Sequence, residues 1–286
     1  MPADRSPDAP DTTDSPGTAT APVDLALLES LLADTSGPVA HAEHRLADHA
    51  DLVGPLVLRA SALEEFRAAL PDGVRDVQVH LVADATDERD GLTNLREARN
   101  GLFDEDRVEV VGVQLALPRE ADPAAAAAVL LDILDFSAPA WIQVPLVEGW
   151  AAALDVVAED GTENVAVDVA SPAADLAAFV RHAVGLGLSF RVTGAPGALA
   201  GSVRDPGAGH EVPGLLNLLC AVRAATDGAD AAAVEALLTA TGAAALAADL
   251  RTTTPAQAAA VRSALASVDT ADVGEVVLDL QALGLV

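Results

Sequence analysis

Apolar runs rich in Val, Leu and Ile alternate with Ala- and Leu-rich stretches along most of the chain. The runs have the length and β-branched content of strands and recur about every 25–30 residues. We expect strands at Leu52–Leu58, Val77–Ala83, Val108–Leu117, Trp141–Val147, Asn164–Ala170 and Leu188–Thr193. Between them we expect helices at Ser61–Leu70, Leu92–Gly101, Pro123–Phe136, Gly149–Ala158 and Ala173–Gly185. Repeated strand–helix units are typical of a parallel sheet.

Side chains within the expected strands divide into two faces. Gln78 and His80 share one face, opposite Val79, and Arg191 alternates with Phe190 in the same way. An open doubly wound sheet needs apolar residues on both faces. A closed barrel accepts polar side chains in its interior, especially near the carboxyl ends of the strands. The pattern therefore favours an α/β fold of the (β/α) barrel type.

The pattern weakens at both ends of the chain. Met1–Pro22 is rich in Pro, Asp, Thr and Ser, which predicts a disordered tail. Beyond Thr193 the strand–helix alternation gives way to helices, with one short strand, Ala264–Val268, as the single candidate. We expect one barrel-like domain over Val23–Val286, and an incomplete or distorted barrel in its last third stays open. The additional helices are expected at Val23–Leu32, Val39–Ala50, Pro213–Thr226, Ala231–Thr239, from near Thr254, and at Val273–Leu283.

Composition removes several kinds of chemistry. All 16 basic residues are arginines, so a P-loop lysine and a Schiff-base lysine are excluded. One cysteine, Cys220, excludes an internal disulfide and an iron–sulfur cluster. The 44 acidic residues give a formal net charge of −28, which argues against nucleic acid as a partner. The acidic excess fits either a salt-adapted host or the codon bias of a high-GC genome.

No apolar stretch reaches the length of a membrane-spanning helix, and the N-terminus lacks the apolar core of a signal peptide. We therefore expect a soluble cytoplasmic protein without a membrane partner.

Polar residues at or near the ends of the expected strands form the main candidate site, because the strands of a barrel end at one mouth where function concentrates. The candidates are Arg59, His80, Asp84, Gln114, Gln143, Asp168, Arg191 and Thr193. Arg59 and Arg191 could clamp a carboxylate or phosphate by bidentate hydrogen bonds. Asp168 could act as a general base if burial raises its pKa. The alternative is an internal ion pair between Arg191 and Asp168 that performs no chemistry.

Three histidines, His41, His44 and His49, lie close together in the sequence. Their spacing differs from the i, i+4 pair of a helical metal site, so we interpret them as surface side chains. We expect no metal and no cofactor.

Glycines follow the last expected strand, at Gly194, Gly197, Gly201 and Gly207. They could bring backbone N–H groups to an anion, but they match no phosphate-binding pattern, and a surface loop explains them. Three further residues are expected to pack rather than react, namely Cys220, Trp141 and Trp150.

Four stretches carry a resemblance to known proteins: AHAEHRLADHADLVGPLVL (Ala40–Leu58), Phe190–Thr193, GLLNLLCAVRAA (Gly214–Ala225) and LDLQALGLV (Leu278–Val286). Together they make the chain resemble an uncharacterised family of high-GC bacterial proteins. The resemblance implies a barrel-like fold and no defined activity. Family members carry Lys-x-Arg-Thr-Gly-Gly where this chain reads Ala166–Ser171, and Gly-Leu-His-His where it reads Gly194–Gly197. The resemblance thus implies a divergent member that lacks most of the polar motif residues.

Two functions of different class remain open. The first is a binding protein or scaffold, a degenerate barrel without catalysis. The second is an enzyme acting on a small anionic metabolite by a lyase- or aldolase-like step without a lysine, with Asp168 as base and Arg59 and Arg191 as the anion clamp.

Overall fold

Eight parallel strands close into a barrel in the computed structural model of the chain, which describes residues 25–84, 88–102, 105–135, 137–161, 164–194, 203–204 and 211–286. The order around the barrel is β1-β10-β7-β6-β5-β4-β3-β2. The strands are β1 (Leu32–Asp34), β2 (Val53–Arg59), β3 (Val77–Val82), β4 (Val108–Ala116), β5 (Ala140–Gln143), β6 (Asn164–Asp168), β7 (Ser189–Thr193) and β10 (Leu265–Thr270). The predicted (β/α) barrel is confirmed, and it closes fully.

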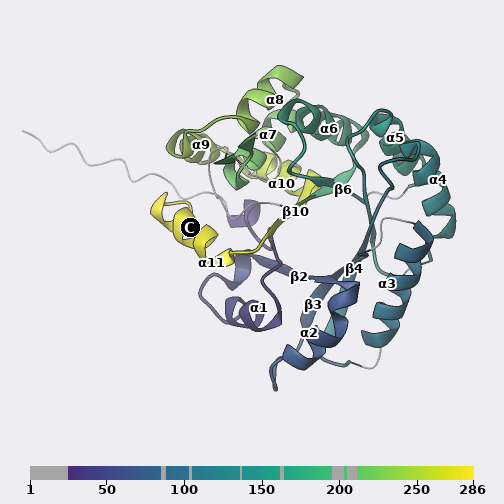
Figure 1. The fold of residues 1–286 in the computed structure, drawn as a ribbon. Coiled ribbons are helices and arrows are strands. Elements are labelled where there is room, and N and C mark those ends of the chain that lie inside the picture. Colours follow the sequence, from purple (N-terminus) through teal and green to yellow (C-terminus); the bar gives the residue numbers. More distant parts are fainter. Residues whose placement is uncertain are drawn as a thin grey trace, which may run out of the picture.

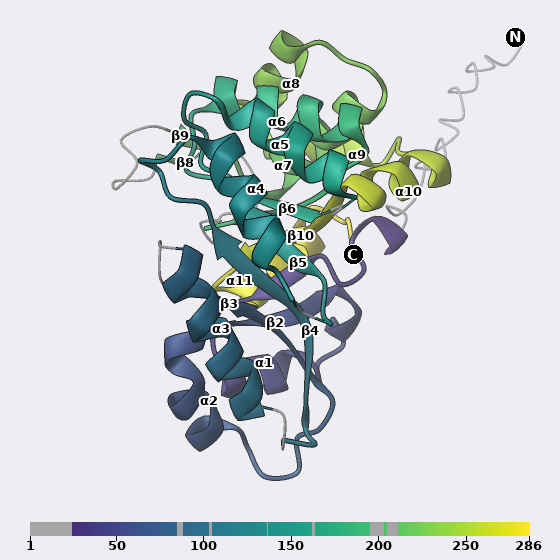
Figure 2. The same ribbon diagram turned by 90° about the vertical axis from the view of Figure 1, so that its right-hand side faces the viewer.

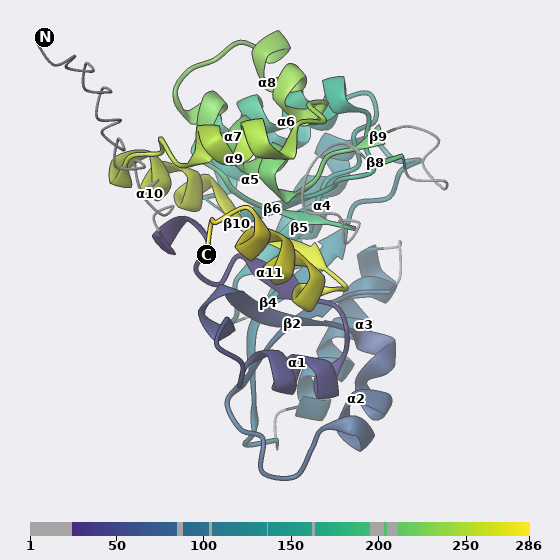
Figure 3. The ribbon, with the colours of Figure 1, turned by 90° about the vertical axis from the view of Figure 1, so that its left-hand side faces the viewer.

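Helices surround the strands, as Figure 1 shows. They are α1 (Pro38–His44), α2 (Leu63–Ala69), α3 (Glu88–Leu102), α4 (Pro123–Ile133), α5 (Trp150–Asp160), α6 (Ala173–Leu186), α7 (Leu215–Thr226), α8 (Ala231–Leu238), α9 (Ala243–Leu250), α10 (Pro255–Ala264) and α11 (Val273–Ala282). Short 3₁₀ helices are η1 (Leu25–Leu27), η2 (Ala50–Leu52) and η3 (Ala60–Ala62), and β8 (Val203–Arg204) pairs with β9 (Glu211–Val212). Figures 2 and 3 show α7, α8 and α9 gathered on one side of the barrel, away from α1 and α2.

The helix expected at Val23–Leu32 is wrong over its described residues, because Leu25–Leu27 form only the 3₁₀ turn η1 and Leu32 already begins β1. Ser30 has a positive φ of 51°, a backbone conformation that ends the 3₁₀ turn of η1. The chain then enters β1, whose three residues pair with β10 on one side and with β2 on the other. A strand this short has too little periodicity to be read from sequence.

Three other predicted boundaries also change. The helix expected at Val39–Ala50 ends at His44, and the strand expected at Trp141–Val147 ends at Gln143, shortly before Pro145. Proline supplies no N–H for a ladder, which accounts for the early end of β5. The short strand considered at Ala264–Val268 exists as β10 and is longer than predicted, so it completes the barrel.

The apolar faces of the strands pack outward against the helices. One cluster of buried residues runs from Leu27 to Leu285. Phe190 of β7 meets Phe179 of α6 edge-on, with ring centroids 5.7 Å apart. The predicted packing role of Cys220 is confirmed, because it is fully buried in α7, and burial raises the pKa of its thiol to about 12.

Several predicted features lie outside the described residues: the tail Met1–Pro22, the end of the expected helix at Phe136, and Gly197, Gly201 and Gly207. Among the helices that are described, none has both the length and the apolar character needed to cross a bilayer.

Candidate functional site

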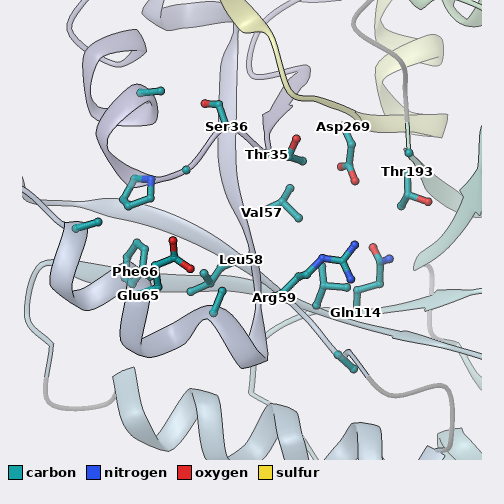
Figure 4. Close-up of a pocket in the computed structure, with 18 of the residues that line it drawn as sticks. Thr35, Ser36, Val57, Leu58, Arg59, Glu65, Phe66, Gln114, Thr193 and Asp269 are labelled. Carbon is teal, nitrogen blue, oxygen red and sulfur yellow. The ribbon is translucent and has the colours of Figure 1, made fainter.

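A cavity of about 890 Å³ opens at the carboxyl ends of the strands and extends between helices α1 and α2 (Figure 4). We call it the mouth cavity. At its barrel end lie side chains from six strands: Arg59, Gln114, Gln143, Asp168, Thr193 and Asp269. Its other end lies between the helices and is lined mainly by small or apolar side chains, with Glu43 and Glu65 among them. The site therefore combines a polar end with an apolar arm.

The structure brings together five of the eight predicted site residues. Arg59, Gln114, Gln143, Asp168 and Thr193 all line the mouth cavity. The remaining three, His80, Asp84 and Arg191, are not among its lining residues.

A chain of hydrogen bonds crosses the barrel end of the cavity. Gln114 Nε2 donates to Gln143 Oε1 at 3.0 Å, and Gln143 Nε2 donates to Thr193 Oγ1 at 3.4 Å. The Thr193 hydroxyl donates in turn to the Val167 carbonyl at 3.3 Å, which fixes the direction of the chain. Gln114 Oε1 is left without a partner among the described atoms, although the residue is only 2% exposed. A buried acceptor of this kind needs a donor from water or from a ligand.

Arg191 lies inside the barrel, as its strand parity predicts, with only 1% of its side chain exposed. Its expected ion pair with Asp168 is wrong, because Arg191 Nη2 donates to Asp269 Oδ1 of β10 at 2.5 Å. Strands β10 and β7 are neighbours, and the register pairs Ser267 with Arg191, so Asp269 stands one layer above the guanidinium. Burial raises the pKa of Asp269, while the charge of Arg191 and its hydrogen bond oppose that rise.

Asp168 ends β6 and serves the turn that follows. Its Oδ1 accepts a hydrogen bond from the Ala170 backbone N–H at 2.9 Å. No ion pair of Asp168 occurs in the described part of the chain. The carboxylate therefore faces the mouth cavity without a cation beside it.

His80 is buried in the barrel lumen rather than at the mouth. Its ring lies 6.0 Å from that of Trp141, between centroids, and it occupies the space that a side chain on Gly112 would fill. Burial and the nearby charge of Arg191 lower the pKa of His80 well below its usual range, so the ring is neutral. His80 Nε2, Arg191 Nε and Arg191 Nη1 have no partner among the described atoms. His80 is thus a polar part of the barrel interior.

Arg59 and Asp84 lie at the rim. The two side chains approach to 4.0 Å, and 74% of the Arg59 side chain is exposed. Asp84 also accepts a hydrogen bond from the Ser61 backbone N–H at 2.6 Å, which ties the end of β3 to η3. Figure 4 shows the Arg59 guanidinium reaching across the cavity toward Gln114.

Carboxylates outnumber cations around the mouth cavity. Four acidic residues line it, Glu43, Glu65, Asp168 and Asp269, and Arg59 is the one cation among the lining residues. Both nearby arginines, Arg59 and Arg191, already have acidic partners. Glu43, Glu65 and Asp168 have no ion-pair partner within the described residues. Carboxylates therefore dominate the charged groups that line the cavity.

The interpretation of His41 as a surface side chain is wrong, since it is only 3% exposed. His41 Nδ1 and His44 Nδ1 both contact Asp34 Oδ2, at 3.2 and 2.9 Å, and Ser36 donates to Asp34 Oδ1. Although burial opposes it, hydrogen bonds from the two histidines and Ser36 lower the pKa of Asp34 to about 2. The cluster fastens α1 to the end of β1. Within the described ranges no group of three or more His, Cys, Asp or Glu side chains is arranged to hold a metal ion.

Two functional residues escape the sequence analysis. Asp269 lies next to the end of β10, a strand whose existence the sequence only suggests, but its alternation with Ser267 is the signal that could have placed it inside the barrel. Asp34 lies in the stretch directly after the expected helix, and nothing in its sequence context points to His41 and His44 as partners.

The chain matches no protein-family model, and no curated protein or solved structure is significantly similar to it.

Proposed function

We propose that this protein is a binding protein that holds a small polar molecule in the mouth cavity. The observation that carries the proposal is the buried, unpartnered acceptor Gln114 Oε1 at the polar end of a cavity of about 890 Å³. Ligand sites in proteins are concave, largely preformed and supplied with a few convergent polar groups. The mouth of a (β/α) barrel is also where such sites occur.

A binding function has better support than the lyase-type reaction considered for an anionic metabolite. That reaction needs Asp168 as base and both Arg59 and Arg191 as the anion clamp. Arg191 is engaged by Asp269 below the mouth, so a single exposed arginine remains on the cavity. An anionic ligand stays a prediction, and the excess of carboxylates over cations around the cavity counts against it.

A catalytic alternative is favoured by one further observation. Asp269 lines the mouth cavity, and burial raises its pKa. A cavity carboxyl group with a raised pKa is a candidate proton donor. If the protein is an enzyme, the compounds that bind will be converted, and Asp269→Asn will stop the conversion while binding persists. If the compounds are recovered unchanged after long incubation, the protein binds them without converting them, and the binding function alone stands.

The experiment is a thermal-unfolding screen against small cations, neutral polyols, and carboxylated and phosphorylated metabolites. A compound at about a hundredfold excess over its Kd adds about 2.7 kcal/mol to the free energy of unfolding. We expect one chemical class to raise the melting temperature. Gln114→Met should remove the effect, whereas the matched change Gln281→Met, at an exposed position of α11, should preserve it. The proposal fails if no class stabilises the protein, or if both variants respond like the parent.

Three further expectations belong with this proposal. Membership of the uncharacterised high-GC bacterial family rests on the sequence resemblance, and the cytoplasmic location rests on sequence alone. Nucleic acid is disfavoured as a partner by the net charge of −28. All three stay predictions.

A further inference from the structure

We propose that the ligand of the mouth cavity is a linear diamine or polyamine, an inference that rests on the proposed binding function. One ammonium group would sit at the barrel end, between Asp168 and Gln114. A second would sit in the arm between α1 and α2, beside Glu65, with the methylene chain lying between them.

At the barrel end, beside the guanidinium of Arg59, lie a carboxylate without an ion-pair partner and an amide oxygen without a donor within the described ranges. Asp168 has no cationic partner among the described residues, and Gln114 Oε1 has no donor. The direction of the hydrogen-bond chain assigns the Gln114 amide hydrogens to Gln143, so the free atom is the acceptor. An ammonium group has three donors and no acceptor, which complements a carboxylate and an amide oxygen. Figure 4 shows the Gln114 amide turned into the cavity.

The arm between α1 and α2 also carries a carboxylate, and an apolar part of the cavity wall separates it from the barrel end. Ala40, Val57, Leu58, Ala62, Phe66 and Ala69 line this apolar part. Glu65 extends into the space between the two helices in Figure 4, and it has no ion-pair partner within the described part of the chain. Carboxylates separated by an apolar surface match positive nitrogens separated by methylene groups.

Charge also distinguishes this ligand from an anion. Arg59, the cation that lines the cavity, approaches Asp84, so an incoming carboxylate or phosphate would compete with Asp84 for it. Arg191 is paired with Asp269 through Nη2, and although its Nε and Nη1 lack partners among the described atoms, it does not line the cavity. The incoming anion would also approach Asp168 and Glu65, whose like charges repel it. An amine is instead attracted by these carboxylates, one at each end of the cavity.

The test is isothermal titration calorimetry of the full chain with 1,4-diaminobutane and spermidine at physiological salt. A chain of net charge −28 attracts any cation weakly, and salt at this level screens such long-range attraction. Mg²⁺ serves as the control for non-specific attraction, and xylitol and citrate represent the neutral and anionic classes. We expect saturable binding of the amines alone.

Matched variants locate the binding. Asp168→Asn keeps an acceptor for the Ala170 N–H and should raise the Kd of spermidine about tenfold, because a charge-assisted hydrogen bond is lost. Glu65→Gln should raise the Kd by about threefold or more, since its carboxylate is exposed. Asp279→Asn and Glu159→Gln, which remove the same charge from exposed positions on α11 and α5, should leave the Kd unchanged.

The outcomes separate the two proposals. If xylitol or citrate binds and the amines do not, the amine proposal is overturned and the binding function stands. Equal weakening by Asp168→Asn and Asp279→Asn, or binding of Mg²⁺ that matches the amines, also overturns it. If nothing binds in either this titration or the wider screen, the binding function itself fails.

Discussion

At the scale of residues, Arg191 and Asp269 face each other inside the barrel, with 1% and 11% of their side chains exposed. Such a pair contributes little net stability, yet breaking it strands a buried charge. We expect Arg191→Ala to lower the free energy of unfolding by about 3–5 kcal/mol near neutral pH. Urea denaturation measures this change.

The pH dependence of the same variant follows from Asp269. Its folded-state pKa is raised by burial, and removing the arginine raises it further. A carboxyl group with a raised pKa loses stability as pH rises through that pKa, so the loss should shrink when the unfolding is repeated near pH 4. The double variant Arg191→Leu with Asp269→Leu should recover much of the loss. An unchanged stability at all pH values would contradict the buried pair.

Asp34 gives the opposite pH dependence. Its folded-state pKa of about 2 lies below the ordinary value of 3.8, so its stabilisation is present above pH 4 and is lost as pH falls toward 2. The shift corresponds to about 2 kcal/mol. We expect Asp34→Asn to flatten the fall in stability between pH 5 and pH 2 by about this amount, measured by urea denaturation at each pH. Parallel curves for the parent and the variant would show that the cluster with His41 and His44 does not hold Asp34 ionised.

At the scale of elements, β4 carries a glycine, Gly112, at a point where the barrel interior has no room for a side chain. A Cβ on Gly112 would lie 2.7 Å from His80 Nδ1 and 3.1 Å from Trp141 Nε1, and both rings are held in the interior. We expect Gly112→Ala to destabilise the protein by about 1–3 kcal/mol, measured by thermal unfolding. Gly185→Ala is the control, because this position of α6 is exposed and nothing lies within 4 Å of its added Cβ, and it should stabilise slightly. If Gly112→Ala behaves like Gly185→Ala, the lumen is wider than described.

The elements also show what sequence can and cannot predict. The six strands between Val53 and Thr193 are long enough for their apolar face to be visible, and each is confirmed with small boundary changes. Strand β1 has three residues, and β10 is preceded directly by α10, so neither has a periodicity of its own. Their identity is set by pairing with each other and with β2 and β7, which is long-range information.

At the scale of the whole molecule, barrel closure explains most of the site. Strand parity directs Gln114, Gln143, Asp168 and Thr193 toward the mouth, and this follows from sequence once a barrel is assumed. The partner of Arg191 could not be predicted in the same way. Asp168 precedes it on the neighbouring strand, whereas Asp269 reaches it through a strand 78 residues later in the chain. The ion pairs inside a closed barrel depend on which strands become neighbours, and the sequence alone does not show this.

The central claim is that the mouth cavity binds a small polar molecule, and its most direct test is a crystal structure with the compound that stabilises the protein most. We expect the compound at the barrel end, with a donor atom about 3 Å from Gln114 Oε1 and in contact with Asp168. A compound bound elsewhere on the protein, with the mouth cavity holding only water, would contradict the account.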